Sequence, residues 1–510
     1  MKKKIKRMAR FIFSKNMFLL LCLLLQAGII IAIYSITNIY FTKILGGTIT
    51  IFAFLLALYI NNSHHHSDTK LAYIIILVLF PLFGTLTYFF AWLGMGNRKF
   101  KKHIKRLNLQ TTPLKQNDNV ISSLPASRIK GLANYAYNTG RFPIYENTSC
   151  KYYPSGENQF LDMLEELKSA KQFIFLEYFI IQNGEMLDRI MDILKEKTQE
   201  GVEVRFMYDG TSSIAKIPHS FAKKTNKLGI KCKMFMPVRA ILSTEQNNRD
   251  HRKLCIIDNR VCFTGGINLA DEYINKVQPY GYWKDVGCKL EGEAVTSFTQ
   301  MFLKMWNFKQ KTIEPFKPYL NQKHAKDSDG LFIPISDHPH DGEDISKTFI
   351  LHILQNAKKY VRITTPYLIL DDELKNAISN TAKRGVEVSI ITPNLPDKKL
   401  IYCVTQTNYR QLIDAGVKIY QYLPGFIHAK MIISDDKSAI LGTVNLDYRS
   451  LFLNFENSVY IYQNSQIEKM NEDFLSTVEE SKLITKAEYK KISIFKRCIG
   501  RLLKLFAPLM

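Results

Sequence analysis

The sequence lacks closely spaced cysteine pairs. None of its cysteines forms a C-x-x-C pair or a spacing typical of a zinc site. A zinc ribbon and a dithiol redox motif are therefore excluded, and we expect reduced thiols, no metal and no cofactor. The eight cysteines lie at positions 22, 150, 232, 255, 262, 288, 403 and 498.

Acidic residues are also scarce. The chain has 46 Asp and Glu residues against 69 Lys and Arg residues, which gives a formal net charge of +23. Two basic clusters, Lys2 to Arg10 and Arg98 to Arg106, flank an apolar N-terminal region. Because cations beside apolar segments are typical of contact with anionic lipid headgroups, their placement favours a membrane as the partner and disfavours nucleic acid.

A cleavable signal peptide is not indicated, because no small-residue cleavage site is apparent. Three apolar blocks, 17–36, 44–60 and 71–93, each approach the roughly 20 residues that a spanning helix needs. Both basic clusters should prefer the cytoplasmic side, which requires an even number of crossings between them. We therefore expect a multi-pass protein of the cell membrane, with one block re-entrant or interfacial and the rest of the chain cytoplasmic.

The remainder of the chain contains an internal repeat. AKQFIFLEYF at 170–179 is echoed by AKKYVRITTPYL at 357–368. Each copy is followed by a helical pattern and a Gly-Val-Glu-Val segment, at 201–204 and 385–388. Short strands that alternate with helices indicate crossover units. We therefore predict two α/β halves, with mainly parallel β-sheets flanked by helices, that pack against each other.

Each repeat ends in a motif of five residue types at fixed offsets. From a histidine, Lys lies at +2, Asp at +7, Gly at +14 and Asn at +17 in both copies. A lone His-x-Lys would be a weak signal, whereas two matching copies are a strong one. The copies are His251, Lys253, Asp258, Gly265 and Asn268, and His428, Lys430, Asp435, Gly442 and Asn445.

The doubled H-x-K-x4-D-x6-G-[GST]-x-N motif resembles the phospholipase D superfamily. Together with the apolar N-terminal blocks it resembles bacterial cardiolipin synthases, over nearly the whole chain. This resemblance implies two pseudo-symmetric phospholipase D-like halves preceded by transmembrane helices. The expected regions are a membrane anchor (1–106), a connecting segment (107–150), the first half (151–320), a linker (321–344), the second half (345–482) and a basic amphipathic C-terminal helix (483–510).

Two imidazoles in one cleft can divide the work on a phosphodiester, because imidazole is both a nucleophile and a proton shuttle near neutral pH. The resemblance implies a covalent phosphohistidine intermediate, with His251 as the nucleophile and His428 as the acid and base. Motif symmetry also allows the reverse. Lys253 and Lys430 are expected to stabilise the phosphate charge, assisted by amides of Asn268 and Asn445.

The family motif includes Asp258 and Asp435 among the catalytic residues, but their odd offset points away from the histidine along a strand. Each aspartate begins a turn-like pair, which favours a scaffold role for both. Better candidates to orient the imidazoles are Asp285 and Glu456, since a carboxylate on one ring nitrogen fixes the tautomer.

Other positions complete the expected site. Glu177 and Tyr367 end equivalent strands of the two repeats, where open α/β sheets place ligands, and so could line the substrate pocket. The C-terminal segment carries apolar residues on one helical face with basic residues beside them, which favours an interfacial membrane helix over a core-packed one. The apolar residues are Ile494, Phe495, Cys498, Ile499, Leu502, Leu503 and Phe506.

The resemblance implies transfer of a phosphatidyl group from one phosphatidylglycerol to another, giving cardiolipin and glycerol. Anionic membrane lipids are the expected partners. The alternatives are a hydrolytic phospholipase D, another phosphatidyltransferase of the superfamily, a nuclease, or a non-catalytic lipid-binding protein. The membrane blocks count against the nuclease, and two intact motif copies count against a non-catalytic relic.

Overall fold

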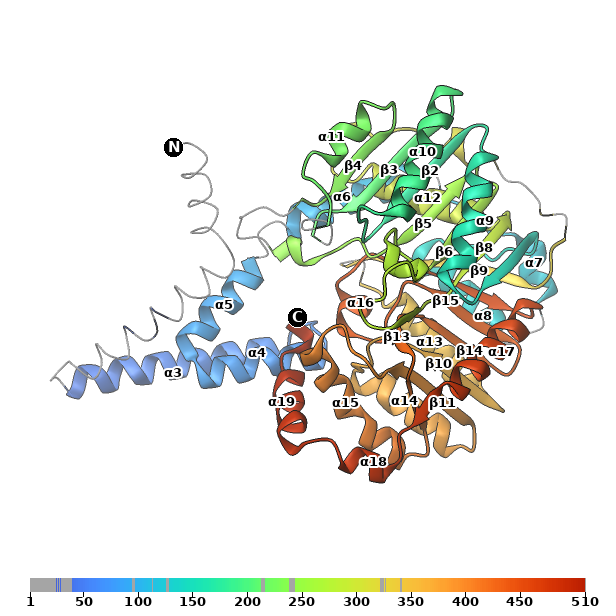
Figure 1. Ribbon diagram of the computed structural model, residues 1–510. Helices are drawn as coiled ribbons and strands as arrows, with labels where there is room; N and C mark the ends of the chain where they lie inside the picture. The colour runs from blue at the N-terminus through green and yellow to red at the C-terminus, as the bar shows by residue number, and fades with distance from the viewer. Residues whose placement is uncertain are drawn as a thin grey trace. The chain divides into compact units, whose positions relative to one another are not determined.

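The computed structural model describes residues 24, 26, 28, 39–93, 97–111, 113–124, 128–211, 216–237, 244–321, 325, 327–339 and 342–509. The chain forms two compact units (Figure 1). The first contains Met1–His103, Val238–Asn248 and Leu502–Met510, and the second contains Ile104–Pro237 and Arg249–Arg501.

The first half of the second unit is built on a seven-stranded sheet of order β1-β8-β6-β5-β2-β3-β4. Alternate residues of β2 face opposite layers, as the pleat of a strand requires. Ile174 and Leu176 join the core beneath α9 and α10, whereas Phe175 stacks on Phe302 of α12 at 4.6 Å between ring centroids. The elements are β1 Thr148–Tyr153, α9 Gly156–Lys168, β2 Phe173–Tyr178, α10 Glu185–Gln199, β3 Glu203–Asp209, α11 Phe221–Asn226, β4 Lys231–Phe235, β5 Lys253–Ile257, β6 Val261–Gly265, β7 Tyr282–Lys284, β8 Gly287–Gly292 and α12 Val295–Trp306.

The second half repeats this plan on an eight-stranded sheet of order β17-β12-β11-β10-β14-β15-β16-β9. In β10, Val361 and Ile363 face the core under α13 and α14, while Arg362 lies over the Phe474 ring of α17. The elements are β9 Leu331–Asp337, α13 Ile345–Asn356, β10 Tyr360–Thr364, α14 Asp372–Lys383, β11 Glu387–Pro393, α15 Lys399–Asp414, β12 Lys418–Tyr422, β13 Gly425–Ile427, β14 Met431–Ser434, β15 Ser438–Gly442, α16 Tyr448–Phe452, β16 Glu456–Tyr462, α17 Gln466–Glu479, β17 Ser481–Leu483, α18 Lys486–Lys490 and α19 Ile494–Lys504.

The two halves pack against each other, as the repeat predicted. The helices α12 and α17 follow the equivalent strands β8 and β16, and each also contacts a strand of the other half, β9 and β1 respectively. Tyr152 Oη of β1 donates to Asp473 of α17 at 2.6 Å. Asn457 Nδ2 donates to Thr264 Oγ1 at 2.7 Å, again across the boundary.

The prediction of mainly parallel sheets is wrong. Only β2-β3-β4 and β10-β11-β12 run parallel, and every other named pair in these two sheets is antiparallel. The parallel strands are the ones joined by crossover helices, which the repeat revealed. The histidine segments instead open hairpins, β5–β6 and β14–β15, and hairpin connections produce antiparallel pairs.

The segment expected to be a linker contains a strand. Leu331–Asp337 forms β9, which pairs with β16 along its whole length at the edge of the second sheet. Phe332, Ile333 and Ile335 are fully buried. The sequence did not predict this strand, because its short apolar run is flanked by Asp, Gly and Pro residues. Such turn signals are typical of a loop as well as of the ends of a strand.

The N-terminal unit contains α3 Ile39–Asn61, α4 Ser67–Leu79 and α5 Pro81–Leu93. The second apolar block lies in α3, while the third is divided at Phe80, since a residue before proline is driven out of the helical region. The first block and the basic cluster at 2–10 lie outside the described residues, except for positions 24, 26 and 28. Among the helices that the structure describes, none has both the length and the apolar character needed to cross a membrane.

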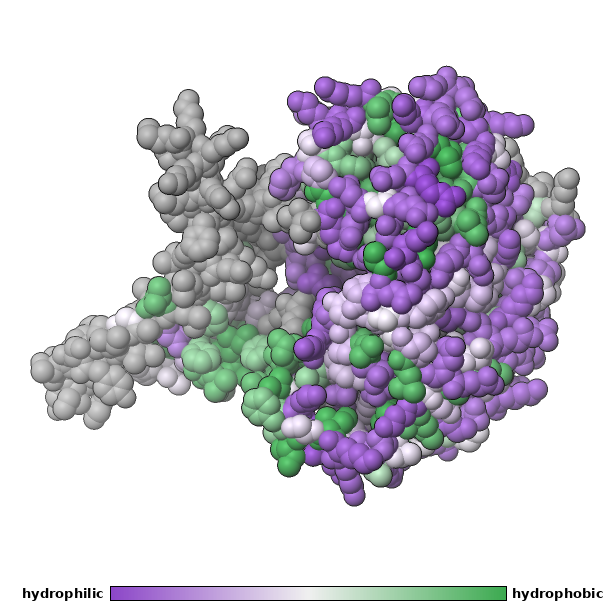
Figure 2. Space-filling view, in the orientation of Figure 1, coloured by the Kyte–Doolittle hydropathy of each residue, from purple (hydrophilic) through white to green (hydrophobic). Residues whose placement is uncertain are grey.

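The C-terminal segment, expected as one helix over 483–510, contains two shorter α-helices, α18 Lys486–Lys490 and α19 Ile494–Lys504. On the apolar face of α19, Ile494 and Phe495 are 71% and 73% exposed, whereas Ile499 and Leu503 are partly buried. Figure 2 shows hydrophobic side chains gathered along α19. The remaining N-terminal helices are α6 Asn97–Gln110, which carries the second basic cluster, α7 Asp118–Ser123 and α8 Arg128–Gly140.

Candidate active site

The two histidines lie just before the first strands of equivalent hairpins. His251 precedes β5 and His428 precedes β14, and each residue is 7% exposed. Each lysine two residues later points to the same side as its histidine, because side chains alternate along an extended chain. Lys253 Nζ donates to the His251 carbonyl oxygen at 2.6 Å, and Lys430 Nζ donates to the His428 carbonyl oxygen.

Each imidazole is held by a carboxylate of the other half. His251 Nδ1 lies 2.8 Å from Glu456 Oε2, and His428 Nδ1 lies 2.7 Å from Asp285 Oδ2. Both carboxylates are fully buried. A carboxylate on Nδ1 favours the Nδ1–H tautomer, which leaves the lone pair of Nε2 of each ring available.

The main chain of each histidine is also hydrogen-bonded to the other half. The N–H of His251 donates to the carbonyl oxygen of Phe455, the residue before Glu456, at 2.9 Å. The N–H of His428 donates to the carbonyl oxygen of Lys284, the residue before Asp285, at 2.7 Å. Each histidine is therefore fixed twice to the opposite half, through its main chain and through its ring.

Both imidazoles are biased toward the neutral form. Burial and the nearby cations Lys253 and Lys430 hold the pKa of His251 well below its usual value. Burial, followed by the charge of Lys430, lowers the pKa of His428 to about 3, although Asp285 opposes the shift. Since Lys430 acts on His251 and Lys253 acts on His428, the two motif copies share one electrostatic environment.

The two lysines are themselves buried cations with lowered pKa values. Burial lowers the pKa of Lys253 to about 7, and Lys430 adds to this effect while Glu456 opposes it. Burial lowers the pKa of Lys430 to about 8 against the charge of Asp285. A bound phosphate would favour the charged form of both lysines, which then stabilise negative charge in a site largely closed to water.

The two carboxylates differ in their charge. Burial would raise the pKa of Asp285, but His428 and Lys430 outweigh it and hold the pKa below its usual value. Burial raises the pKa of Glu456 to about 7, against the charge of Lys253 and hydrogen bonds from Thr443 and Asn454. Asp285 is therefore ionised at neutral pH, whereas Glu456 is close to half protonated.

The two carboxylates also differ in the motif residue that packs against them. The residue after the motif glycine is Gly266 in the first half and Thr443 in the second. A Cβ atom at Gly266 would lie 2.0 Å from Asp285 Oδ1, so the carboxylate occupies the space of a side chain. Thr443 fills the equivalent position and donates its hydroxyl to Glu456.

The motif aspartates lie at the other end of the hairpins. The Asp258 carboxylate accepts hydrogen bonds from the backbone N–H groups of Lys171, Gln172 and Phe173 at 2.7 to 2.8 Å. Asp435 accepts the equivalent three bonds, at 2.7 to 2.9 Å, from residues 358 to 360. Each aspartate starts a turn with positive φ, 54° and 56°. Their position in the structure is that of scaffold residues, away from the imidazoles.

The motif asparagines differ from each other. Asn268 Oδ1 accepts the N–H of Ile180 at 3.0 Å, and its Nδ2 donates to Tyr273 Oη at 2.7 Å. Asn445 Oδ1 is buried and has no hydrogen-bond partner in the described part of the chain. Asn268 therefore holds the loop after β2 in place through its hydrogen bond with Ile180.

The two pocket candidates have different surroundings. Glu177 is fully buried and lies 3.9 Å from Arg252 Nη1; burial and the charge of Asp250 raise its pKa well above the usual value. Glu177 is therefore close to the first motif at Arg252, the residue between His251 and Lys253. Tyr367 Oη donates to Asp397 at 2.6 Å and accepts from Lys398 Nζ at 3.0 Å.

Sequence reasoning missed Lys398 and Arg449, whose positive charges also lower the pKa of His251. Lys398 follows β11, so its place after the carboxyl end of a parallel strand could have identified it. Arg449 lies in the short helix α16, which carries no comparable signal.

Comparison with known proteins defines the class. Residues 163–306 and 350–478 match the family described as the phospholipase D-like domain of cardiolipin synthase, and the two segments contain the two motif copies. Residues 48–91 match the phospholipase D-nuclease N-terminal family. The fold and the paired histidines are thus those of a phospholipase D-like protein. Within that class, the chain belongs to the cardiolipin synthase family.

Individual relatives agree with this placement. An uncharacterized protein of Streptococcus mutans is 44% identical, over 89% of this chain and 99% of its own. A cardiolipin synthase of Alkalihalophilus pseudofirmus is 31% identical, over 90% and 93%. The crystal structure of a phosphatidylserine synthase of Haemophilus influenzae shares the fold, with a TM-score of 0.56, 16% identity and coverage of 74% and 98%. These relatives and the N-terminal match indicate a membrane-associated phosphatidyltransferase.

Proposed function

We propose that the protein synthesises cardiolipin by transferring a phosphatidyl group from one phosphatidylglycerol to the headgroup hydroxyl of a second, with release of glycerol. The observation that carries the proposal is the reciprocal pairing of His251 with Glu456 and His428 with Asp285 around two shared lysines. Two oriented imidazoles and two cations are the groups that double displacement at a phosphodiester requires.

In the first displacement, Nε2 of neutral His251 attacks phosphorus and the bond to the glycerol oxygen breaks. In the free site His428 is neutral with its proton on Nδ1, so the acid is the imidazolium that forms when the negative charge of the bound phosphodiester and of Asp285 favours protonation of Nε2. This imidazolium donates its Nε2 proton to the glycerol oxygen, so that glycerol leaves neutral and phosphatidyl-His251 remains. The difference between the carboxylates supports these roles. Ionised Asp285 stabilises a cationic His428 poised to donate, whereas half-protonated Glu456 favours a neutral, nucleophilic His251.

In the second displacement, His428 takes the proton from the headgroup hydroxyl of the second phosphatidylglycerol. The alkoxide attacks phosphorus and the bond to His251 Nε2 breaks. One phosphodiester replaces another, so no nucleotide is needed. Lys253 and Lys430 stabilise the charge on the phosphate oxygens in both displacements.

The substrates stay in the bilayer, because withdrawing a two-chain lipid costs about 0.8 kcal/mol for each exposed methylene. Many large apolar side chains of α3 to α5 are exposed, among them Phe52, Phe54 and Trp92, which suits contact with lipid. We infer that the protein is held at the cell membrane by its N-terminal region. The basic clusters at 2–10 and 98–106 favour a cytoplasmic location for the catalytic unit.

The test uses the purified full chain in mixed micelles of phosphatidylglycerol and a neutral detergent. The expected products are glycerol and a four-chain lipid in equal amounts, and His251→Ala should abolish both. Phosphatidic acid as the main product would instead indicate a hydrolytic phospholipase D, and no lipid turnover by the intact protein would reject both activities.

The histidine roles are tested separately by mass spectrometry of peptides. His428→Ala should accumulate a phosphatidyl adduct on the peptide that contains His251, because the second displacement lacks its base. His251→Ala should give no adduct. An adduct on the His428 peptide in His251→Ala would reverse the assignment and leave the overall reaction intact.

A further inference from the structure

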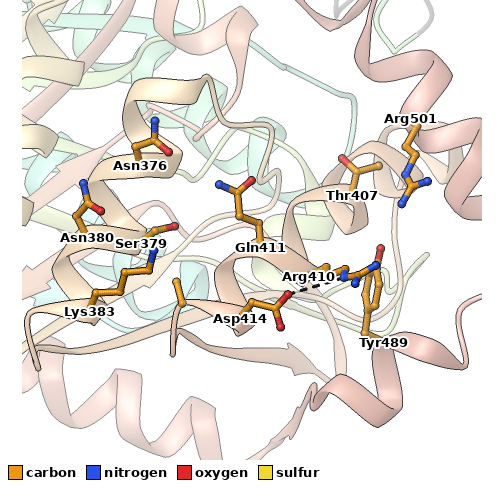
Figure 3. Close-up of a pocket in the computed structure, with 11 residues that line it drawn as sticks. Asn376, Ser379, Asn380, Lys383, Thr407, Arg410, Gln411, Asp414, Tyr489 and Arg501 are labelled. Atoms are coloured by element: carbon orange, nitrogen blue, oxygen red, sulfur yellow. Dashed lines mark ion pairs between the residues drawn. The ribbon is translucent and has the colours of Figure 1, made fainter.

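A polar cavity separate from the histidine site lies among the helices of the second half. It has a volume of about 390 Å³ and is formed by α14, α15, α18 and α19 (Figure 3). In Figure 3, Asn376, Ser379, Asn380 and Lys383 lie along one side, and Arg501 lies at the other side with Thr407 and Gln411 between them. None of its lining residues belongs to the histidine site.

The cavity has an excess of positive charge. Lys383, Arg410 and Arg501 come from three different helices, against a single carboxylate, Asp414. Lys486 Nζ lies 2.8 Å from Asp414, closer than Arg410 at 3.8 Å. Lys383 and Arg501 have no ion-pair partner among the described residues. An anion is therefore the ligand whose charge this cavity complements.

A buried hydroxyl also indicates a missing ligand. Ser379 is only 4% exposed, and its Oγ has no hydrogen-bond partner in the described part of the chain. Buried polar groups in native structures are nearly always paired, so a lone hydroxyl facing a polar cavity points to a partner that the protein does not supply. The amides of Asn380, from α14, and of Gln411, from α15, add further polar groups to the lining of the cavity.

The helix that carries Arg501 also carries exposed apolar residues. Gly500 brings α19 against α15, since a Cβ atom there would lie 2.3 Å from the Cys403 carbonyl oxygen. This contact fixes Arg501 at the cavity, while Ile494 and Phe495 of the same helix remain more than two-thirds exposed. A free phosphate ion could not make favourable contacts with these apolar side chains. A lipid could, because it has acyl chains as well as an anionic headgroup.

We propose that this cavity binds the phosphodiester headgroup of an anionic phospholipid that remains in the bilayer, as a second lipid site that takes no part in the displacements. Arg501 binds the phosphate on the α19 side of the cavity, and Lys383 and Ser379, on the opposite side, bind hydroxyl groups at the far end of the headgroup. Ile494 and Phe495 lie among the acyl chains. The site goes beyond the proposed synthase reaction and does not depend on it.

The test counts bound lipids by native mass spectrometry of the full chain in detergent. Every variant carries His251→Ala, so that no lipid is consumed, and the probe is short-chain phosphatidylglycerol. Lys383→Gln/Arg501→Gln should bind one lipid fewer than the parent, and Ser379→Ala should weaken the same event by about three- to tenfold. The control, Lys223→Gln/Lys224→Gln, removes two exposed cations from α11 and should bind as many lipids as the parent.

Three results would overturn the proposal. An unchanged lipid count in Lys383→Gln/Arg501→Gln would remove the site, as would equal occupancy by short-chain phosphatidylcholine. Displacement of the lipid by inorganic phosphate or glycerol phosphate at similar concentrations would make it a site for a soluble anion. A thermal melt by circular dichroism checks that each variant is folded. Because no turnover is measured, failure here is distinct from failure of the synthase reaction.

Discussion

The first and second halves hold their histidines by the same backbone contacts but with different carboxylates. In both halves the histidine N–H bonds to the residue that precedes the carboxylate of the other half. Yet Asp285 has a lowered pKa, while the pKa of Glu456 is raised to about 7. The two halves therefore have matching backbone contacts but carboxylates of different charge, which is the difference on which the proposed roles of His251 and His428 rest.

The largest effect should come from neutralising Asp285, and the matched change at Glu456 gives the comparison. Asp285→Asn should lower kcat by about 10³- to 10⁴-fold, because the amide no longer stabilises a cationic His428 or fixes its tautomer. Glu456→Gln should lower kcat only about tenfold near pH 7, since Glu456 is already half protonated there. Steady-state rates of glycerol release measure both. Equal losses in the two variants would contradict the electrostatic difference between the halves.

The next effect concerns the position after the motif glycine. Gly266→Ala places a methyl group against Asp285 and should displace it from His428, with a loss of about 10²-fold in kcat. Thr443→Ala removes one hydrogen bond to Glu456 and should cost about tenfold or less. Thermal melts of both variants serve as folding controls. A Gly266→Ala enzyme as active as Thr443→Ala would show that Asp285 has room to move.

A smaller effect is expected in the pH profile. Lys253 is charged below its pKa of about 7 and neutral above it, and Lys430 behaves likewise around pH 8. The phosphate-stabilising charge is thus present at low pH, and kcat/KM should fall as pH rises through 7. Lys253→Arg, which stays charged, should move this fall upward by about one unit. Lys430→Arg should leave the midpoint of the fall in kcat/KM near pH 7. An equal shift of this midpoint in both variants would contradict the assignment of the fall to Lys253.

The smallest effect on activity should come from the motif aspartates. Five residue steps of about 3.3 Å each separate Lys253 from Asp258, which begins the turn. Asp258→Asn and Asp435→Asn should therefore lower stability by about 1 to 3 kcal/mol while kcat changes less than about twofold. The loss should be larger for Asp258, which is buried, than for the partly exposed Asp435. Thermal unfolding in detergent measures it, and a large fall in kcat at a temperature where the variant is folded would restore a catalytic role.

Much of this site could be predicted from the chain alone because it is repeated. The offsets in the two copies predicted the histidine and lysine pairs, and the same spacing predicted that Asp258 and Asp435 begin hairpin turns, as their positive φ values bear out. Asp285 and Glu456 were expected beside the imidazoles, and both lie on a ring nitrogen. Which carboxylate contacts which histidine could not be predicted, because the exchange between halves depends on tertiary packing.

Features that are not repeated were harder to predict. The strand β9 lies among turn residues, so its short apolar run gave no periodicity to recognise. The sheets were expected to be mainly parallel because the crossover helices have a strong sequence pattern, whereas strands added by hairpins do not. Lys398 and Arg449 act on His251 through space, and each lies in a segment whose placement depends on the fold.

The contact between each histidine and the opposite half also constrains when a newly made chain becomes active. Glu456 and the carbonyl of Phe455, both needed by His251, are synthesised more than two hundred residues later, and the partners of His428 must already be folded. A nascent chain that has emerged only through its first half therefore contains one histidine motif without its orienting carboxylate. The order of the two halves along the chain therefore keeps the first histidine without its orienting carboxylate until the second half has been made.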